Sequence, residues 1–362
     1  MANSKVNFAD IGTRIPEPVM ELQDLIKSKS FEYGDLRSLV TIIGDVDFKK
    51  KIGFLGELGD IGVKANATNC SLNEVQALMS TTGKDWDPKD WDTQLKLCAE
   101  DVEGTIAQLS LKKGVQKYDL TDTEYFDLFI EALEIAINKM YFRFVWFADK
   151  DAANVSDSPN GYITDGKDVD FINVIDGLWK RARAIIAATP GQRIDIPANT
   201  EVTTSAQNAA LTKELALTYA ENLYYNAPLD MQAEMIGGGY KAYCTVAFFN
   251  KLIRNFKSFE LESMKTNLEN GMFSVNINGL EFVPVPEWDK MINTWENLGA
   301  SKRDPFRVLV YETANALVGV PSLETWAMFD AYYWKKDKSM YIDLADKIDA
   351  LFLHDNRVMV AI

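Results

Sequence analysis

Few side chains in this 362-residue sequence have the types and spacing that catalysis needs. The single histidine, His354, is followed by Asp355 close to the end of the chain. The sequence contains no G-x-S-x-G nucleophile motif, and no cysteine has a base beside it. A catalytic histidine needs a nucleophile or a metal within reach. We therefore interpret His354 as a surface histidine without a catalytic role.

The cysteines give no framework for disulfides or metal. Cys70, Cys98 and Cys244 are odd in number and widely spaced, and no C-x-x-C pair is present. Disulfide scaffolds and zinc knuckles both need closely spaced pairs. We expect three small buried side chains in a reducing compartment.

A glycine triplet and an acidic loop are the remaining candidates for a ligand site. The triplet at 237–239 follows a helix-like stretch and precedes a strand, whereas a phosphate loop leads from a strand into a helix. It therefore predicts a helix end and a flexible joint. The loop lacks the glycine and glutamate of an EF-hand, so we expect it to be solvated, with a structural calcium ion as the minor alternative. Its five candidate ligands are Asp149, Asp151, Asn154, Asp157 and Asp165.

No group of residues therefore specifies an enzyme, and we expect no catalytic, cofactor-binding or metal-binding residues. The one dense basic run, FKKKIGF at 48–54, is either a solvated strand end or a charged contact that docks a projecting loop onto an acidic neighbour. With 53 acidic residues, paired carboxylates are too frequent to mark an acid-base site.

Composition excludes several classes of protein. The formal net charge of −15 argues against gripping nucleic acid through its phosphates or binding an anionic membrane. A hydrophobic fraction of 47% is typical of globular chains. No stretch approaches the length of a membrane span, and the first residues lack the apolar core of a signal peptide. We expect a soluble protein made in the cytosol, with two domains or one domain with extensions.

The first third of the chain predicts extended segments that position one long helix. Residues 1–38 read as an arm interrupted by prolines, and 39–84 as a glycine-punctuated hairpin or long loop that projects and packs on something else. Residues 87–109 read as partly helical, with a proline near the start. The strongest helix is predicted at 122–147, where a T-x-x-E capping box begins a run with a single narrow polar stripe.

The rest of the chain predicts a mixed body. Helices are expected at 171–191, 205–228 and 286–299, and a strand opens 237–253. The dipeptide Asn278-Gly279 between two β-prone runs predicts a tight hairpin, because both turn positions need positive φ. Strands are expected within 306–313, 325–334, 338–344 and 356–362.

This order of elements resembles the major capsid protein of tailed bacteriophages, which has the Hong Kong 97-like fold. Residues 83–101 are similar to the lead-in to the spine helix of that family, and DTEYFDLFIEALEIAINKMYFRFVWFAD at 122–149 to the spine helix itself. GLWKRARAI at 177–185 resembles a helix of the axial domain, and VNINGLEFVPVPEWD at 275–289 its hairpin. DPFRVLVYETANALVGVPS at 304–322 resembles the return to the peripheral domain.

The resemblance implies an α+β fold with five regions. These are an N-terminal arm (1–38), an E-loop that forms an extended hairpin (39–84), a peripheral domain (85–170) with the spine helix at 122–147, an axial domain (171–310) and return strands (311–362) that complete the peripheral and axial sheets.

The function implied is structural. The chain would self-assemble into hexamers and pentamers of an icosahedral phage head that encloses double-stranded DNA without sequence-specific binding. It would be made in the cytoplasm of a host bacterium and end in the virion. Since the arm begins at Met1, scaffolding is expected from a separate protein or not at all, and portal and decoration proteins are further partners. Lys64 and Asn66 are candidates for a covalent cross-link.

Two alternatives remain. An encapsulin-like compartment would use the same fold to enclose a cargo enzyme. A hydrolase or transferase acting through scattered carboxylates would instead need a concave pocket in which the pKa values of those carboxylates are shifted.

Overall fold

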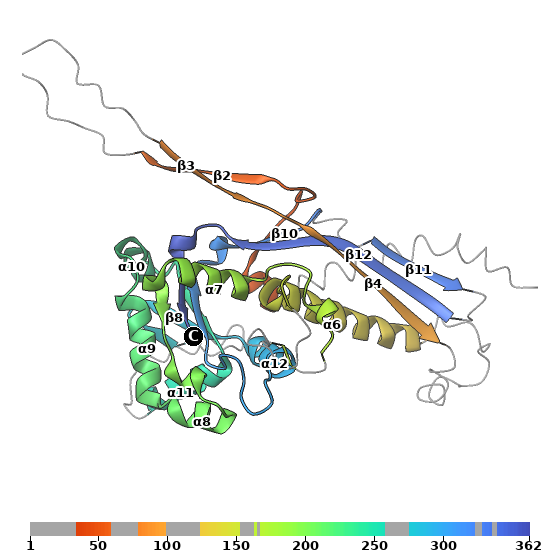
Figure 1. The fold of residues 1–362 in the computed structure, drawn as a ribbon. Coiled ribbons are helices and arrows are strands. Elements are labelled where there is room, and N and C mark those ends of the chain that lie inside the picture. Colours follow the sequence, from red (N-terminus) through yellow and green to blue (C-terminus); the bar gives the residue numbers. More distant parts are fainter. Residues whose placement is uncertain are drawn as a thin grey trace, which may run out of the picture.

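The computed structural model describes residues 34–58, 79–98, 124–152, 163–164, 167–257, 275–322, 328–334 and 339–362. They form a five-stranded sheet, a six-stranded sheet, a separate two-stranded hairpin and a set of helices (Figure 1). Residues 1–33 of the predicted arm lie outside the described residues. So do these candidates: Lys64, Asn66, Cys70, Asn154, Asp157 and Asp165.

The long helix is present where the sequence predicts it. Helix α6 spans Glu124–Phe147, and its 24 residues are roughly 36 Å long at 1.5 Å per residue. Its C-terminal half is buried almost all round, with Tyr141, Val145 and Trp146 each at most 1% exposed. Such a helix acts as a surface on which other elements pack (Figure 1).

The five-stranded sheet lies along this helix. Its strand order is β1 (Thr41–Ile43), β10 (Ala316–Gly319), β12 (Ser339–Phe352) and β11 (Met328–Trp334), and β4 (Lys89–Cys98) also pairs with β12. Strand β12 changes partners part-way along. Ser339 to Ile348 pair with β4, whereas Asp349 to Phe352 pair with β10. One strand therefore joins two parts of the sheet.

Strand β4 corrects the helix that the sequence predicts within 87–109. Ten consecutive pairs join Lys89–Cys98 to β12. Along this stretch Trp91, Thr93 and Leu95 alternate with exposed Asp92, Gln94 and Lys96. That period of two is typical of a strand with one buried face, and it outweighs the proline signal for a helix start. Residues 99–109 lie outside the described residues.

The six-stranded sheet is covered by helices on both faces. Its order is β5 (Arg193–Ile194), β13 (Met359–Ala361), β9 (Val308–Tyr311), β6 (Lys241–Cys244), β8 (Leu280–Pro284) and β7 (Val275–Ile277). Side chains alternate along β9, so that Leu309 and Tyr311 join the core with α6, whereas Val308 and Val310 join a second core. That second core contains residues of α9 (Lys213–Tyr225), α10 (Leu229–Ile236) and α11 (Val246–Lys257).

The tight hairpin between β7 and β8 confirms the turn prediction. Asn278 and Gly279 have φ values of 50° and 86°. Two successive positive φ values define the mirror-image turn that matches the twist of the flanking strands. The prolines that follow end β8 and begin helix α12, which spans Pro286–Trp295.

Three predicted helices have different limits. The helix expected at 205–228 is two, α8 (Thr204–Ala210) and α9, because the hydroxyl of Thr212 accepts a hydrogen bond from the N–H of Leu215 and starts a new helix. The helix expected at 171–191 begins only at Leu178 and ends at Ala188, forming α7. The helix expected at 286–299 ends at Trp295, and Gly299 has a φ of 84° in the turn beyond it. Helix α11 follows β6 in a stretch where the sequence predicts only the strand.

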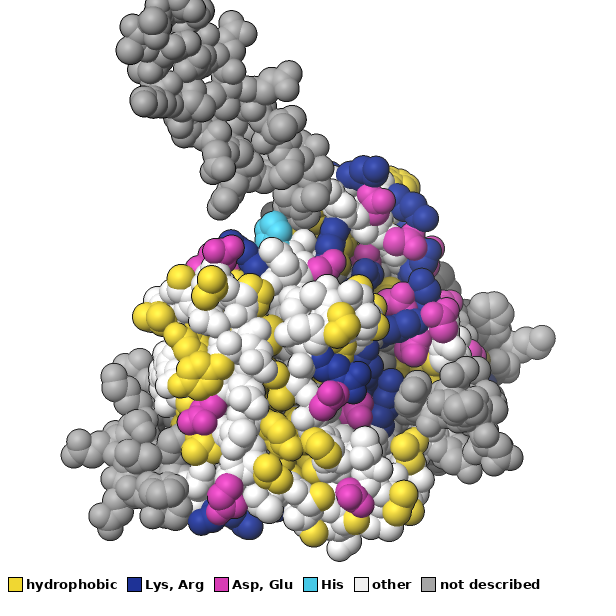
Figure 2. Space-filling view, turned by 60° about the vertical axis from the view of Figure 1, so that its left-hand side comes forward, with side chains coloured by type: hydrophobic (Ala, Val, Ile, Leu, Met, Phe, Trp, Pro, Cys, Tyr) yellow, Lys and Arg dark blue, Asp and Glu magenta, His cyan; other side chains and the backbone are white. Residues whose placement is uncertain are grey.

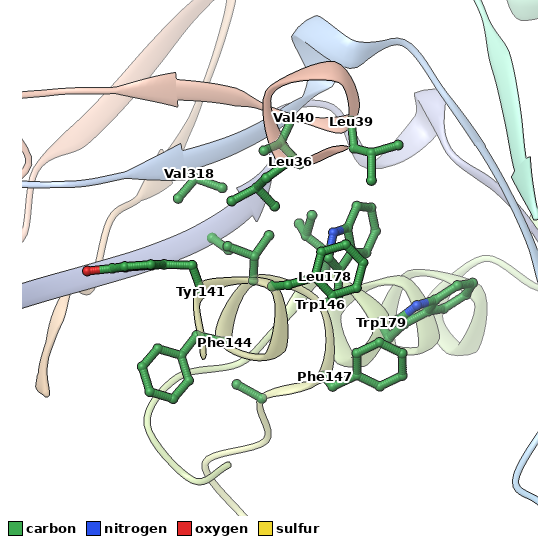
Figure 3. Close-up of a cluster of buried hydrophobic side chains, with 14 of the residues drawn as sticks. Leu36, Leu39, Val40, Tyr141, Phe144, Trp146, Phe147, Leu178, Trp179 and Val318 are labelled. Carbon is green, nitrogen blue, oxygen red and sulfur yellow. The ribbon is translucent and has the colours of Figure 1, made fainter. Parts of the chain in front are cut away.

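The packing of α6 against α7 holds the two sheets together. Trp288 of α12 makes edge contacts with Trp146 of α6 and Trp179 of α7, with ring centroids 4.9 and 4.8 Å apart. Figure 3 shows Trp146 and Trp179 beside Leu178, with Leu36 and other residues of α3 (Gly34–Leu39) above them. Aromatic contacts of this kind add to the free energy gained by burial.

Gly177 allows α7 to begin against the end of α6. Its N–H donates to the carbonyl of Ala148 at 2.8 Å. A Cβ on Gly177 would lie 2.9 Å from the backbone nitrogen of Ala148 and from the carbonyl carbon of Trp146. Only glycine permits this approach without moving one helix.

We expect Gly177→Ala to lower the free energy of unfolding by about 1–3 kcal/mol, because the added methyl group overlaps rigid backbone. Urea denaturation followed by tryptophan fluorescence measures the change. Gly191→Ala is the matched control, since a Cβ there meets nothing within 4 Å. Equal stabilities of the two variants would contradict this reading of the α6–α7 contact.

Candidate functional site

The residues that could do chemistry take part in structural contacts. His354 is half-buried in the turn after β12, where its backbone N–H donates to Oδ1 of Asn315 at 2.7 Å. Burial, assisted by the charges of Arg357 and Lys84, lowers the pKa of His354. Asp355 pairs with Lys84 of strand β3 (Met79–Asp85). These contacts fix the turn and the base of the hairpin that β3 forms with β2 (Lys51–Leu58).

The thiol of Cys244 is inert, and the glycine triplet ends a helix. Cys244 is fully buried in β6, and burial raises the pKa of its thiol well above the usual value. Gly237 follows α10 directly, and Gly238 has a φ of 79° before β6 begins. This position agrees with a helix end and joint.

The acidic loop places its first two acids around a lysine. The carboxylates of Asp149, Asp151 and Asp176 have oxygens within 4.8 Å of one another, a spacing compatible with a cation. The ammonium of Lys180 on α7 lies among them, with Nζ to oxygen distances of 2.5, 2.5 and 2.7 Å. Burial alone would lower the pKa of Lys180, but the hydrogen bonds to the three carboxylates outweigh burial and raise it. The ammonium of Lys180 thus neutralises part of the charge of this cluster, and Nζ of Lys150 lies 3.0 Å from Oδ2 of Asp176 as a second ammonium.

The next residue of α7 reaches a different segment. Nη2 of Arg181 binds Oδ1 of Asp349 at 2.9 Å, and Asp349 is 1% exposed at the point where β12 changes partners. The same carboxylate accepts the backbone N–H groups of Asp87 and Ala350, each at 2.8 Å. Burial raises the pKa of Asp349, although Arg181 and these N–H groups oppose the rise.

The third basic residue of α7 joins a buried ion network. Arg183 binds Asp304 at 3.0 Å between its Nη2 and Oδ2. In the same loop Arg307 is fully buried and pairs with Glu296 at the end of α12. The guanidinium of Arg307 also stacks on Trp179, 5.2 Å from the ring centroid. A buried charge is tolerated when paired and hydrogen-bonded in this way.

The base of the hairpin formed by β2 (Lys51–Leu58) and β3 (Met79–Asp85) attaches to the same region. Nζ of Lys84 donates to the carbonyl of Phe352 at 2.6 Å, and Trp86, just after β3, is 1% exposed beside Gly319. Asp87 then bonds Asp349 through its N–H, while its carboxylate binds Lys49 and Lys89. We name this set, Lys84, Trp86, Asp87, Arg181 and Asp349, the hairpin anchor.

The contacts of the hairpin anchor attach the hairpin to the body of the protein. It joins α7, β12 and the start of β4 at the point from which the hairpin leaves the body (Figure 1). Local sequence patterns do not identify these residues, because Asp349 lies 168 positions from Arg181 and 262 positions from Asp87. The only local signal was the spacing of basic residues in GLWKRARAI.

Sequence comparisons find no match, whereas structural comparison finds chains with a similar fold. No protein-family model matches this sequence, and no curated protein is similar to it. The structure of the satellite phage P4 procapsid including the size determination (Sid) protein contains a chain that is similar to this one. The two chains superimpose with a TM-score of 0.51 and are 11% identical. The match covers 92% of this chain and 96% of that chain.

Two other similar structures have lower scores. A chain of Microbacterium phage Oxtober96 has a TM-score of 0.49 and 11% identity, covering 91% of this chain and 90% of the other. A chain of the holo-SrpI encapsulin complex from Synechococcus elongatus PCC 7942 has a TM-score of 0.47 and 8% identity, covering 90% and 85%. Of these three chains, the P4 procapsid chain has a TM-score above 0.5, and we base the fold assignment on it.

The chain therefore has the mixed helix-and-sheet fold of phage capsid proteins, as the sequence resemblance predicted. The boundaries of the arm, E-loop, peripheral and axial regions remain predictions. Among the described helices, none combines the length and apolar character needed to cross a membrane.

We expect Lys180→Ala to lower the free energy of unfolding by about 1–3 kcal/mol, because three neighbouring carboxylates lose the positive charge that they share. Millimolar calcium chloride should restore part of the loss in the variant and leave the native chain unchanged. Thermal denaturation with and without calcium measures both effects. Lys213→Ala, which removes an exposed pair with Glu214, is the control. Equal stability of the two variants would refute the role of Lys180.

We expect Arg181→Gln to be more destabilising at pH 7 than at pH 5. Because the pKa of Asp349 is raised in the folded chain, Asp349 takes up a proton as the pH falls toward the ordinary value of 3.8, and a neutral Asp349 needs Arg181 less. The loss at pH 7 should be about 1–3 kcal/mol and should shrink at pH 5.

Urea denaturation at the two pH values measures this difference. Arg193→Gln is the control, since Arg193 pairs with Asp195 at the surface. An equal loss for Arg181→Gln at both pH values would show that the charge of Asp349 is unimportant.

Proposed function

We propose that this protein is the major capsid subunit of a tailed phage, which self-assembles into the hexamers and pentamers of an icosahedral head around double-stranded DNA. The similarity to a chain of the P4 procapsid over nearly the whole of both chains supports the capsid role. A structural role needs no catalytic residue, which agrees with the contacts of His354 and Cys244.

The hairpin of β2 and β3 is the observation that supports assembly. Strands β2 and β3 pair only with each other among the described residues, and they project from the body (Figure 1). A two-stranded hairpin alone is marginally stable in water, and its outer edges have unpaired backbone groups. A neighbouring subunit that covers the hairpin would provide the missing contacts.

The surface of the helical end supports the same role. Leu229, Ile236 and Tyr225 are 80%, 68% and 61% exposed on α9 and α10. Figure 2 shows this side of the molecule, where hydrophobic side chains are spread among uncharged ones and charged side chains are few. Three large apolar side chains exposed on two consecutive helices favour a contact with another protein.

Charge and partners complete the proposal. The net charge of −15 suits the wall of a shell around DNA, because it repels the packed phosphates. Separate scaffolding, portal and decoration proteins are the further partners, and synthesis takes place in the cytoplasm of the host. No observation favours a hydrolase or transferase. An encapsulin-like compartment would differ in enclosing a cargo enzyme instead of DNA.

The test is assembly of the purified chain. We expect closed shells in negative-stain micrographs, and we expect Lys50→Glu with Lys51→Glu to stop shell formation while the subunit stays folded. Lys50 and Lys51 are exposed at the base of the hairpin, and like charges would repel an acidic neighbour. Light scattering and circular dichroism measure assembly and folding.

Lys290→Glu, an exposed change on α12, is the matched control and should leave assembly intact. A native chain that stays monomeric under all conditions would overturn the proposal. Shells with the same yield from the double variant would overturn the role of the hairpin. Nucleic acid extracted from shells assembled in the host supports a phage head, and a co-purified enzyme supports a compartment.

A further inference from the structure

The turn between β7 and β8 carries a reactive dipeptide. Asparagine followed by glycine is chemically labile, because glycine has no side chain to hinder the attack of its backbone nitrogen on the asparagine carboxamide. Asn278 precedes Gly279, and Asn278 is exposed. The same dipeptide begins at Asn160 and at Asn270, both of which lie outside the described residues. The pair at Asn278 is thus the one whose surroundings the structure describes.

The reaction of such a pair is deamidation. The backbone nitrogen of Gly279 loses its proton to a base and bonds to Cγ of Asn278, and the side-chain nitrogen leaves as ammonia. Water then opens the cyclic succinimide. Breaking the new bond from Cγ to nitrogen gives aspartate, whereas breaking the original peptide bond gives isoaspartate, whose main chain is longer by a carbon atom. The reaction consumes water and needs no enzyme or cofactor.

The folded turn holds the two reacting atoms apart. Asn278 and Gly279 have φ values of 50° and 86°, and a residue in this left-handed region has a ψ of roughly 30–60°. At that ψ the nitrogen of Gly279 points away from the side chain of Asn278, whereas ring closure needs both on the same side of the Cα–C bond. This bond must therefore rotate, and the rotation breaks the turn.

Asn276 holds the turn closed at the reacting nitrogen itself. Its Oδ1 accepts the N–H of Gly279 at 3.0 Å, so this nitrogen turns toward Asn278 only after the hydrogen bond has broken. Gly279 also lies against the end of α10, where a Cβ would be 3.1 Å from the carbonyl oxygen of Met235. Attack on Asn278 thus requires a local opening of the turn.

We propose that Asn278 is a deamidation site of this protein, which the folded turn suppresses and which Asn276 controls through its hydrogen bond to Gly279. The reaction proceeds only while the turn is open, and it is irreversible. The modified fraction therefore records how long the turn has been open.

The product alters the neighbouring surface. Isoaspartate lengthens the turn, and Gly279 already lies against the backbone of Met235 and Ile236. The end of α10 must then shift, and with it the exposed side chains of Ile236 and Leu229. That this shift weakens a contact between subunits rests on the proposed function, whereas the chemistry at Asn278 does not.

Peptide mapping by mass spectrometry tests the proposal on unassembled full-length chains, incubated with and without guanidinium chloride. In the unfolded chain we expect Asn278 to convert about as fast as Asn160 and Asn270, because the dipeptide is the same. In the folded chain the conversion of Asn278 should be about tenfold slower or more. Asn276→Ala should make it about fivefold faster in the folded chain and leave the rate in the unfolded chain unchanged.

Asn297→Ala is the matched control. Oδ1 of Asn297 accepts the N–H of Gly299 at 3.1 Å in the turn after α12, so this variant loses the same kind of hydrogen bond in a different turn. It should leave the conversion of Asn278 unchanged.

Equal conversion of Asn278 in the folded and unfolded chains would overturn the proposal. So would equal rates in the folded chain with and without Asn276→Ala, including the case in which Asn278 stays intact in both. Because the measurement uses unassembled chains, a failure of the proposed capsid function would leave its result unaffected.

Discussion

The approach of α7 to the end of α6 is the contact on which the rest of the structure depends. It is possible only because Gly177 has no Cβ. Once α7 is in this position, Lys180, Arg181 and Arg183 each reach a carboxylate in a different segment. A displacement of α7 would act on all three ion pairs together, because their basic side chains belong to the same helix.

The three ion pairs connect three segments of the chain to the single helix α7. Lys180 holds the loop after α6, Arg183 holds the loop before β9 of the six-stranded sheet, and Arg181 holds β12 of the five-stranded sheet. Asp349 also accepts a hydrogen bond from the backbone N–H of Asp87, which follows the hairpin. Asp349 is thus one buried link between α7 and the base of the hairpin, beside the contacts that Lys84 and Trp86 make there.

Much of the fold could be predicted from local patterns. The polar stripe predicted α6, and Asn278-Gly279 predicted the hairpin of β7 and β8. Each of these signals is formed by residues that are close together in the sequence. The period of two in β4 was also present but was masked by Pro88. The hairpin anchor could not be predicted in the same way. Arg181 and Asp349 are 168 residues apart, and no single sequence shows which of 53 acids a given arginine will meet.

The uninterrupted pairing of β4 with β12 has a mechanical consequence. Ten consecutive residues of each strand are in antiparallel register, and the hydrogen bonds lie across the strands. A pull along the strand axis therefore loads these bonds together in shear, whereas a pull across the sheet would open them one at a time. The sheet beside α6 should resist stretching along its strands far better than peeling from its edge.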